Sequence, residues 1–433
     1  MNFVIFIKEK ILYNVLYLKD MKTIAVIDLK AFYSYVECVD RGLDPWKTPL
    51  VVADIERSPN TIILSVTPYL KQKGIPSRLR IKDLPKGIDY IYAVPRMSKY
   101  IEMSTKVVSI LLDFVSSEDM HVYSIDEAFV DLTTYLDYYK KSPKEIVRMM
   151  IDKITEETGL MATAGIGDNF FLAKAALDLY AKKEKDGIAI MHKEDVESKL
   201  WPITPLSKMW GIGQRLEKRL NNLGIFSVGQ LAKSNRDFMR SKFGIIGDQL
   251  VDCANGIDES DIREEYIPKE NSLSIGQTLP KNYSSKEART VITELIDDLS
   301  LRLRNEKYKT EVVALSVGYA SNRGGFSHQM SLLNKTDDTE ILKKAIFEIY
   351  NQYIEDEPIR RLYVSFGKLS KTTEREQLSL FMDYKTMEDN HNLQMMIDNL
   401  HNKYGKDIVM RASAMLEEST AKERHSMIGG HRK

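Results

Sequence analysis

The amino-acid sequence predicts an α+β protein. Residues 24–29, Ile-Ala-Val-Ile-Asp-Leu, form a nearly continuous apolar run, which is typical of a strand buried on both faces. Residues 31–41 have the pattern of a helix, and short apolar runs at 49–52 and 62–66 indicate further strands. These elements mix without the strict strand–helix alternation of a doubly wound sheet, so the pattern favours α+β.

The same mixture continues along the chain. Residues 122–132 predict two short strands that meet at the acidic pair Asp126-Glu127. The apolar run 24–29 is interrupted by the single carboxylate Asp28, and a buried Asp needs a partner. Three further elements are expected: a helix at 143–157, a strand at 161–166 and a helix at 170–183.

A separate α/β unit is expected near the C-terminus. Ser284 and Glu287 form a capping box before a helix whose apolar residues recur at helical spacing, namely Val291, Leu295, Leu299 and Leu303. Alternating apolar residues predict strands at 313–319 and 362–366, with a second helix at 338–354. After Lys368 the chain turns polar, so the tail, residues 371–433, is expected to be only partly ordered.

Length and composition limit the classes of function. A chain of 433 residues is long enough for about two to four compact domains. It has 62 basic and 62 acidic residues, so any contact with nucleic acid would depend on local asymmetry of charge. Two cysteines, Cys38 and Cys253, are too few for a disulfide framework, and no Cys/His cluster suggests structural zinc. A reducing compartment, the cytoplasm, is therefore expected.

Residues 1–20 are apolar enough to raise the question of a membrane segment. Lys8, Glu9 and Lys10 divide them into two runs, each too short to span a bilayer, so no membrane partner is expected. One interpretation is an amphipathic flap. The other, which we prefer, is an upstream start that precedes a natural Met21, because the first well-formed strand begins just after that residue.

Charge is distributed unevenly in the middle of the chain. Residues 201–250 carry eight basic side chains against three acidic ones, whereas residues 251–270 carry two basic side chains against seven acidic ones. This reversal marks a plausible domain boundary and leaves a basic helical segment before it.

Three carboxylates are candidates for metal binding. Asp28 lies at the end of the first strand, and Asp126 and Glu127 lie at the later strand junction. If they met they would repel one another unless cations neutralised them, and oxygen ligands of this kind suit Mg²⁺ or Mn²⁺. Two such ions can activate a 3′ hydroxyl and stabilise a leaving pyrophosphate. Spacing alone also allows a plainer interpretation, in which Asp28 is a buried cap and the pair an exposed turn.

Two longer segments around these acids resemble motifs of the Y-family (UmuC-like) translesion DNA polymerases. Residues 26–37, Val-Ile-Asp-Leu-Lys-Ala-Phe-Tyr-Ser-Tyr-Val-Glu, resemble that family's opening motif, and residues 123–132, Tyr-Ser-Ile-Asp-Glu-Ala-Phe-Val-Asp-Leu, resemble its SIDE-A motif. Two separate matches in the right order are highly specific. The resemblance extends from about Lys22 to Phe381 and is placed in the Gram-positive UV-damage-repair branch.

The resemblance implies a right-hand polymerase with four domains and an N-terminal extension, residues 1–20. These domains are a palm at 21–39 and 99–187, fingers at 40–98, a helical thumb at 188–262 and an α/β little finger at 271–370. It also implies that Asp28, Asp126 and Glu127, with the Leu29 carbonyl, bind two Mg²⁺ ions, for which Mn²⁺ could substitute. Tyr33 would be the steric gate, whose ring clashes with a 2′-OH, although an ordinary core aromatic is the plainer interpretation.

Further residues take nucleotide-binding roles through the same resemblance. Lys71 aligns with the triphosphate-binding cation and Ser65 with a hydroxyl donor, and phosphoryl transfer depends on such positioning and charge stabilisation. Phe32 belongs to the same nucleotide-binding group, although packing is the alternative role for it.

One segment departs from the family pattern. Residues 165–174 match the family's GIG…N..LAK segment, yet Phe170 stands where many members have a Lys that contacts the triphosphate. Lys174 lies one turn further on, and we expect it to serve in packing. This departure bears on the strength of nucleotide binding and not on the type of reaction.

A second motif, Met209 to Ile225, resembles a helix-hairpin-helix. Gly211 and Gly213 would let the backbone approach a DNA phosphate, and Arg215 would add charge, without reading sequence. A structural turn is the alternative.

A short peptide follows the last α/β unit. Gln377, Leu378, Leu380 and Phe381 belong to a Gln-Leu-Ser-Leu-Phe sequence that resembles the peptide with which bacterial polymerases bind the sliding clamp. Such a peptide can place two apolar side chains in a pocket of its partner. A chance match is the alternative.

Taken with the resemblance, these features imply a monomeric DNA-directed DNA polymerase of the SOS or DNA-damage response. Its partners would be primer-template DNA, deoxynucleoside triphosphates and the sliding clamp, and its synthesis past damaged bases would be error-prone. The runner-up is a catalytically weak protein that binds DNA and clamp and regulates access to lesions. The departure at Phe170 favours the runner-up, and the intact acids Asp28, Asp126 and Glu127 argue against it.

Overall fold

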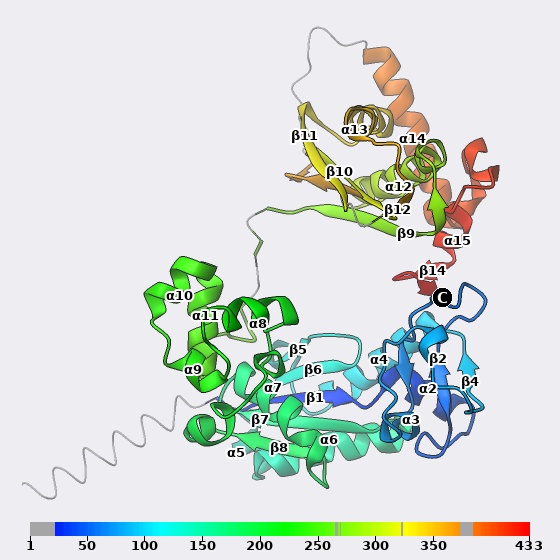
Figure 1. Cartoon of the computed structure of the whole chain (residues 1–433). Coiled ribbons are helices and arrows are strands. Elements are labelled where there is room, and N and C mark those ends of the chain that lie inside the picture. The colour runs from blue at the N-terminus through cyan, green and yellow to red at the C-terminus, as the bar shows by residue number, and fades with distance from the viewer. Residues whose placement is uncertain (1–21, 265–266, 269, 322–323, 373–383) are drawn as a thin grey trace, which may run out of the picture. The chain divides into compact units, whose positions relative to one another are not determined.

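The computed structural model describes residues 22–264, 267–268, 270–321, 324–372 and 384–433. The chain divides into two compact units, residues 1–265 and 266–433 (Figure 1). Both units combine helices with sheets, which confirms the α+β prediction. Among the helices of the described ranges, none is both long enough and apolar enough to cross a membrane.

A five-stranded sheet is the centre of the first unit, in the order β5-β6-β1-β7-β8. Its strands are β1 (Ile24–Leu29), β5 (Met120–Val122), β6 (Glu127–Asp131), β7 (Ala162–Gly167) and β8 (Ile188–Met191). β1 lies between β6 and β7 and is antiparallel to both. Its apolar side chains are almost fully buried, as the continuous apolar run predicted.

Helices pack against this sheet and against each other. They are α2 (Phe32–Asp40), α4 (Met97–Leu112), α5 (Tyr135–Tyr139), α6 (Pro143–Thr158) and α7 (Phe170–Leu179). α7 contacts β1, β7 and β8, whereas α6 contacts β7 and α4. Gly165 lets α7 come close, because a Cβ there would lie only 2.0 Å from the carbonyl oxygen of Ala173. The glycines of β7 therefore fix how near the side chains of α7 lie to β1 and β6.

A small sheet follows α2 in the chain. Its strands pair in the order β3-β2-β4, with bounds β2 (Leu50–Val52), β3 (Ser65–Val66) and β4 (Ile91–Ala93). The short helix α3 (Pro68–Gln72) begins directly after β3, and its Leu70 joins Val51 and Ile63 in a separate apolar cluster. This sheet thus has a core of its own.

A helical segment completes the first unit. It comprises α8 (Gln214–Asn221), α9 (Val228–Ala232), α10 (Arg236–Phe243) and α11 (Ile245–Ala254). Its apolar core is continuous with that of α7. The chain after α11 returns to the sheet domain, where the Arg263 guanidinium donates hydrogen bonds of 2.9 and 2.6 Å to Asp119.

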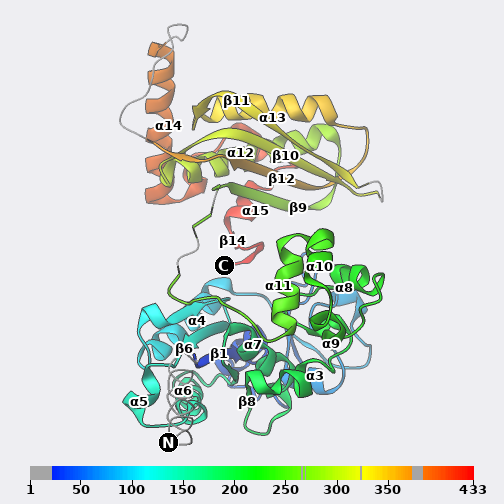
Figure 2. The same cartoon turned by 90° about the vertical axis from the view of Figure 1, so that its left-hand side faces the viewer.

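The second unit is built on a four-stranded antiparallel sheet in the order β11-β10-β12-β9. The strands are β9 (Leu273–Tyr283), β10 (Tyr308–Tyr319), β11 (Gly325–Thr336) and β12 (Ile359–Gly367), and β13 (Ser370–Lys371) pairs with β10. Helices α12 (Ser285–Asn305) and α13 (Thr339–Tyr353) share one apolar core with the sheet (Figure 2). The capping box is present, because Ser284 and Glu287 bond reciprocally at the start of α12.

The segment after residue 383 differs from the partly ordered tail that its polar composition predicted. It forms α14 (Tyr384–Tyr404), α15 (Ala421–His425) and the short strands β14 (Met427–Ile428) and β15 (His431–Arg432). Its polar side chains are used for contacts with α12. Arg304 of α12 donates to Asp398 of α14 at 2.6 and 3.0 Å, and both side chains are buried.

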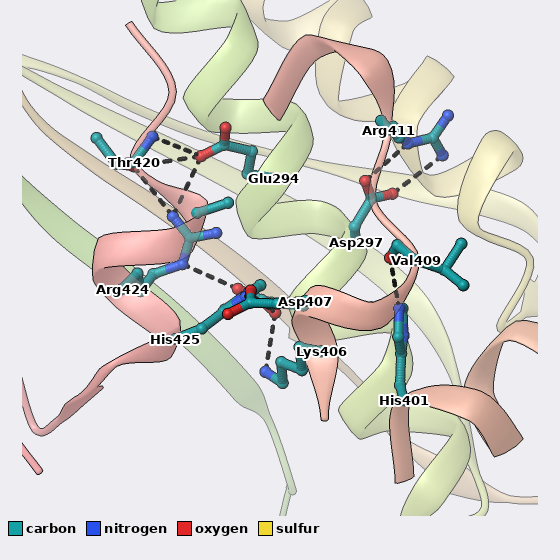
Figure 3. Close-up of polar contacts among 12 residues, drawn as sticks. Glu294, Asp297, His401, Lys406, Asp407, Val409, Arg411, Thr420, Arg424 and His425 are labelled. Carbon is teal, nitrogen blue, oxygen red and sulfur yellow. Dashed lines mark hydrogen bonds and ion pairs between the residues drawn. The ribbon is translucent and has the colours of Figure 1, made fainter. Parts of the chain in front are cut away.

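Three acids on α12 form hydrogen bonds and ion pairs with the residues that follow α14 (Figure 3). Glu294 accepts a hydrogen bond from the Thr420 amide at 3.2 Å, and Asp297 accepts two from Arg411, at 2.7 and 3.0 Å. Asp298 contacts Lys406, Arg424 and His425 at 2.8, 2.9 and 3.1 Å. Although burial alone would raise the pKa of Asp298, these partners hold it well below its usual value. The C-terminal segment is therefore held by buried charges, which a composition-based prediction of disorder does not take into account.

Candidate active site

The three candidate acids meet at one end of the central sheet. The β1–β6 register places Asp28 opposite Glu127. The Leu29 amide donates a hydrogen bond of 2.9 Å to the carbonyl oxygen of Asp126, the residue just before β6. This bond extends the pairing of β1 with β6 by one residue. The structure thus brings together the residues that the sequence placed far apart in the chain.

Burial and mutual repulsion change the protonation of this group. Burial is the main cause that raises the pKa of Asp28 to about 6; the ammonium of Lys182 is the strongest opposing charge, and the charges of Asp126 and Glu127 add to the effect of burial. Burial also raises the pKa of Glu127, against the effect of Lys174. A cation that entered this site would offset the repulsion between the carboxylates. It would therefore favour the ionised form of each of them.

Two lysines reach this acidic group from separate elements. Lys71, on α3, has a lowered pKa because of burial and the like charge of Lys182, while Asp28 and Asp126 oppose the shift. Lys182 lies in the short 3₁₀ turn Ala181–Lys183 that follows α7. The sequence predicted a nucleotide-binding role for Lys71. It did not single out Lys182, which lies within the expected helix 170–183. No local signal marks Lys182, because its position depends on how α7 packs.

Glu127 and Asp126 already have partners inside the protein. The Lys174 ammonium lies 2.6 Å from Glu127 Oε1, and both side chains are only 8% exposed. Ser124 Oγ donates a hydrogen bond of 2.7 Å to Asp126 Oδ1. In the part of the chain that the structure describes, no three His, Cys, Asp or Glu side chains are gathered closely enough to hold a metal ion. Asp28, Asp126 and Glu127 fit a divalent cation in donor type and backbone position, but Glu127 would first have to leave Lys174.

Tyr33 lies in the first turn of α2, beside these acids. Its ring centroid is 4.9 Å from that of Tyr100, and the side chain is half-buried. Burial, and then the charge of Asp126, raise the pKa of Tyr33, which places the ring near the acidic group. Phe32 is instead almost fully buried and packs against Tyr100, so we assign it a packing role. A nucleotide contact by Phe32 stays a prediction.

Ser65 is buried beneath this site. Its Oγ lies 3.0 Å from Ser34 Oγ and donates a hydrogen bond of 3.3 Å to the Ala31 carbonyl. These contacts join β3 to the start of α2, where Ala31 has the left-handed φ of 47°. Ser65 therefore has a structural role, and its contact with a triphosphate stays a prediction.

Three parts of the chain match models of one protein family. Residues 27–178 match the impB/mucB/samB family, residues 193–225 match the helix-hairpin-helix motif of that family, and residues 270–380 match its C-terminal domain. The putative UV-damage repair protein UvrX of Bacillus subtilis is 34% identical over 95% of this chain and 98% of its own length. The chain belongs to the impB/mucB/samB family, the Y-family of DNA polymerases.

Other relatives agree with this assignment. A protein named DNA polymerase IV 2, also from Bacillus subtilis, is 32% identical over 95% of this chain and 99% of its own length. A solved Y-family DNA polymerase chimera, Dbh-Dpo4(243-245)-Dbh, covers 81% of this chain with a TM-score of 0.65. At 20% identity that likeness shows the fold alone, and it supports the palm, fingers and thumb architecture. The domain boundaries predicted from the sequence stay predictions.

The departure of this Y-family chain at Phe170 has a structural explanation. Phe170 is buried, and its ring centroid lies 5.1 Å from that of Phe129. The side chain fills the core where α7 meets β6, so it supplies no charge to a nucleotide. Lys174, for which packing was expected, instead forms the ion pair with Glu127.

The helix-hairpin-helix residues have the geometry that the motif requires. Gly211 has a φ of 88°, which suits glycine, and Gly213 caps the start of α8. An added Cβ at either glycine would meet nothing within 4 Å, and Arg215 is exposed. The backbone at these glycines is therefore exposed, and its contact with a DNA phosphate stays a prediction. The predicted clamp peptide, with Gln377, Leu378, Leu380 and Phe381, and the N-terminal residues 1–20 lie outside the described residues.

We predict that Asp28→Asn stabilises the metal-free protein at neutral pH. The folded protein raises the pKa of Asp28 from 3.8 to about 6, so stability falls as the pH rises through this interval and the carboxylate ionises. Asparagine does not ionise, and urea denaturation with EDTA at about pH 7.5 should show a gain of about 2 kcal/mol. The gain should disappear near pH 3, below the pKa of 3.8 of the unfolded state, where Asp28 is mainly protonated in both states.

The exposed acid Asp137 provides the control, because Asp137→Asn should change stability little at either pH. An equal gain for Asp28→Asn at both pH values would contradict the electrostatic origin of the effect.

Proposed function

We propose that this protein is a template-directed DNA polymerase that adds deoxynucleotides to a primer. The observation that carries the proposal is the β1–β6 register, which sets Asp28 against Asp126 and Glu127 in a member of the Y-family. Relatives that match nearly the whole chain are named DNA polymerase IV, which supports the same reaction.

In this proposal Asp28, Asp126, Glu127 and the Leu29 carbonyl hold two divalent cations, Mg²⁺ or Mn²⁺. When bound, such cations activate the primer 3′ hydroxyl and stabilise the leaving pyrophosphate. Lys71 lies near Asp28 and Asp126 and is placed to neutralise part of the triphosphate charge. Gly211 and Gly213 would bind the DNA backbone, so primer-template is held without reading its sequence.

We further propose that the synthesis is error-prone and proceeds past damaged bases, as part of a DNA-damage response in the cytoplasm. The name of one relative, a UV-damage repair protein, supports this role. A monomer would suffice, because the candidate acids come from a single chain. The alternative, a regulator that binds DNA without catalysis, is not favoured by relatives that are named polymerases.

Primer extension with purified protein and Mg²⁺ tests the proposal, and Asp126→Asn is the decisive variant. It should abolish extension while primer-template binding stays near the parent's, because a neutral amide is a much weaker ligand for a divalent cation than a carboxylate. The exposed control Asp137→Asn should extend normally. If Asp126→Asn retained extension within about tenfold, which is only about 1.4 kcal/mol of barrier, Asp126 would not belong to the catalytic set.

We predict that Tyr33→Ala relaxes the choice of sugar. A smaller side chain beside Tyr100 leaves room for a 2′-OH, so incorporation of ribonucleotides should rise relative to deoxynucleotides in single-nucleotide assays. Tyr138, which is 77% exposed, provides a matched control, and Tyr138→Ala should leave the ratio unchanged. The gate assignment fails if Tyr33→Ala also leaves it unchanged.

The sliding clamp is the proposed partner of the peptide at 377–381. Replacing both Leu380 and Phe381 with Ala should abolish binding to the clamp, since apolar anchors of this size commonly contribute more than about 1–2 kcal/mol each. Extension of a short primer without clamp should stay unchanged, and stimulation by loaded clamp should be lost. Normal clamp binding by the double variant would show that the match is accidental.

A further inference from the structure

Lys174 lies between two carboxylates in the interior of the first unit. Its ammonium is 2.6 Å from Glu127 Oε1 and 3.4 Å from Asp178, which is one helical turn further along α7. Burial alone would lower the pKa of Lys174, but these two acids hold it above its usual value. Both acids are within reach of the ammonium, so either can be its main partner.

The position of Lys174 is fixed by the packing of α7. A Cβ at Gly165 or Gly167 would lie within 3 Å of the α7 backbone, so the helix is as close to β7 as it can be. The Lys174 side chain is only 8% exposed. It can exchange Glu127 for Asp178 with a small change of rotamer, because i and i+4 side chains lie on the same face of a helix.

The Lys174 ammonium and a divalent cation would compete for Glu127. A metal ion bound to Glu127 would repel the ammonium that lies 2.6 Å from its Oε1, so each cation weakens the binding of the other to this carboxylate. The competition involves one of the three acids only, since Lys174 contacts Glu127 and Asp178.

We propose that Lys174 is a positioning residue that holds Glu127 in the metal-free protein and passes to Asp178 when Glu127 binds a divalent cation. The inference rests on the proposed function, because it takes Glu127 to be a metal ligand. Lys174 then has two effects of opposite sign. It stabilises the empty site, and it weakens binding of the cation.

The test is a titration of the full chain with Mn²⁺, without DNA or nucleotide. Free Mn²⁺ is measured by electron paramagnetic resonance, and the melting temperature is recorded at each concentration. In Lys174→Met the half-saturating Mn²⁺ concentration should fall about tenfold, because a nearby positive charge has been removed. The metal-free melting temperature should fall by about 5 °C, because Glu127 is left buried without its counter-ion, and saturating Mn²⁺ should restore it.

Two conservative variants keep the proposal falsifiable if Lys174→Met does not fold. Lys174→Arg retains the charge and can bind Glu127 with two hydrogen bonds, so it should fold and need more Mn²⁺ than the parent. Asp178→Asn removes the alternative partner of Lys174, so it should also need more Mn²⁺. If Lys174→Met or Lys174→Arg leaves the half-saturating concentration unchanged, the proposal is overturned.

Variants of two further lysines distinguish the effect of the Lys174–Glu127 ion pair from that of long-range charge at the site. Lys182 is 54% exposed and lies 3.8 Å from Asp178 but does not touch Glu127, so any effect of Lys182→Met should disappear in about 0.5 M salt, whereas that of Lys174→Met should persist. Lys183→Met, on the exposed neighbour, should change nothing. Equal loss of both effects in salt would overturn the proposal, because it would show that only long-range charge matters.

The same titration distinguishes failure of the proposed function. Asp126→Asn should lose Mn²⁺ binding, whatever the role of Lys174. If Asp126→Asn bound Mn²⁺ as well as the parent, the metal site itself would be wrong, and the inference would fall with it. If Asp126→Asn lost binding but Lys174→Met did not gain it, only the inference would fail.

Discussion

The first unit depends on one costly arrangement, which is the placement of three carboxylates close together at the end of the central sheet, with Glu127 buried and Asp28 and Asp126 partly buried. Isolated charges are strongly disfavoured in such a place, and like charges make it worse. The raised pKa of Asp28, about 6, is the direct sign of this cost. The fold supports the arrangement with backbone hydrogen bonds, since the β1–β6 register fixes Asp28 and Glu127 regardless of their charge.

Three lysines bring positive charge to the three acids, and these lysines differ in how far their side chains are buried. Lys174 is buried on α7 and is restricted by the close packing of that helix on β7. Lys182 is half-exposed in a 3₁₀ turn, and Lys71 comes from the small sheet region, which has its own core. Neutralisation of the acids and neutralisation of a triphosphate can therefore be performed by different residues. The buried Phe170 is compatible with this division, because charge is already supplied from other positions.

The sequence was sufficient for the parts of the structure that depend on local pattern. The apolar run 24–29, the acidic junction at Asp126 and the capping box at Ser284 all correspond to the structure, because each is decided by neighbouring residues. The ion pair of Lys174 with Glu127 was not predicted, since it depends on the contact of α7 with β6 and on side-chain rotamers. The order of residues 384–433 was missed for a related reason, because a polar composition does not show which charges will be buried in pairs.

The acids on α12 have a consequence for any shortened form of this protein. Glu294, Asp297 and Asp298 line the surface that the last fifty or so residues cover, and their partners Arg411 and Arg424 come late in the chain. A proteolytic cut or a stop codon before residue 384 would leave an acidic stripe on a helix that the α/β core needs. A fragment designed from the sequence boundary at residue 370 would therefore be a poor substitute for the C-terminal unit, and a tag placed after Lys433 would be safer than one that replaces the segment.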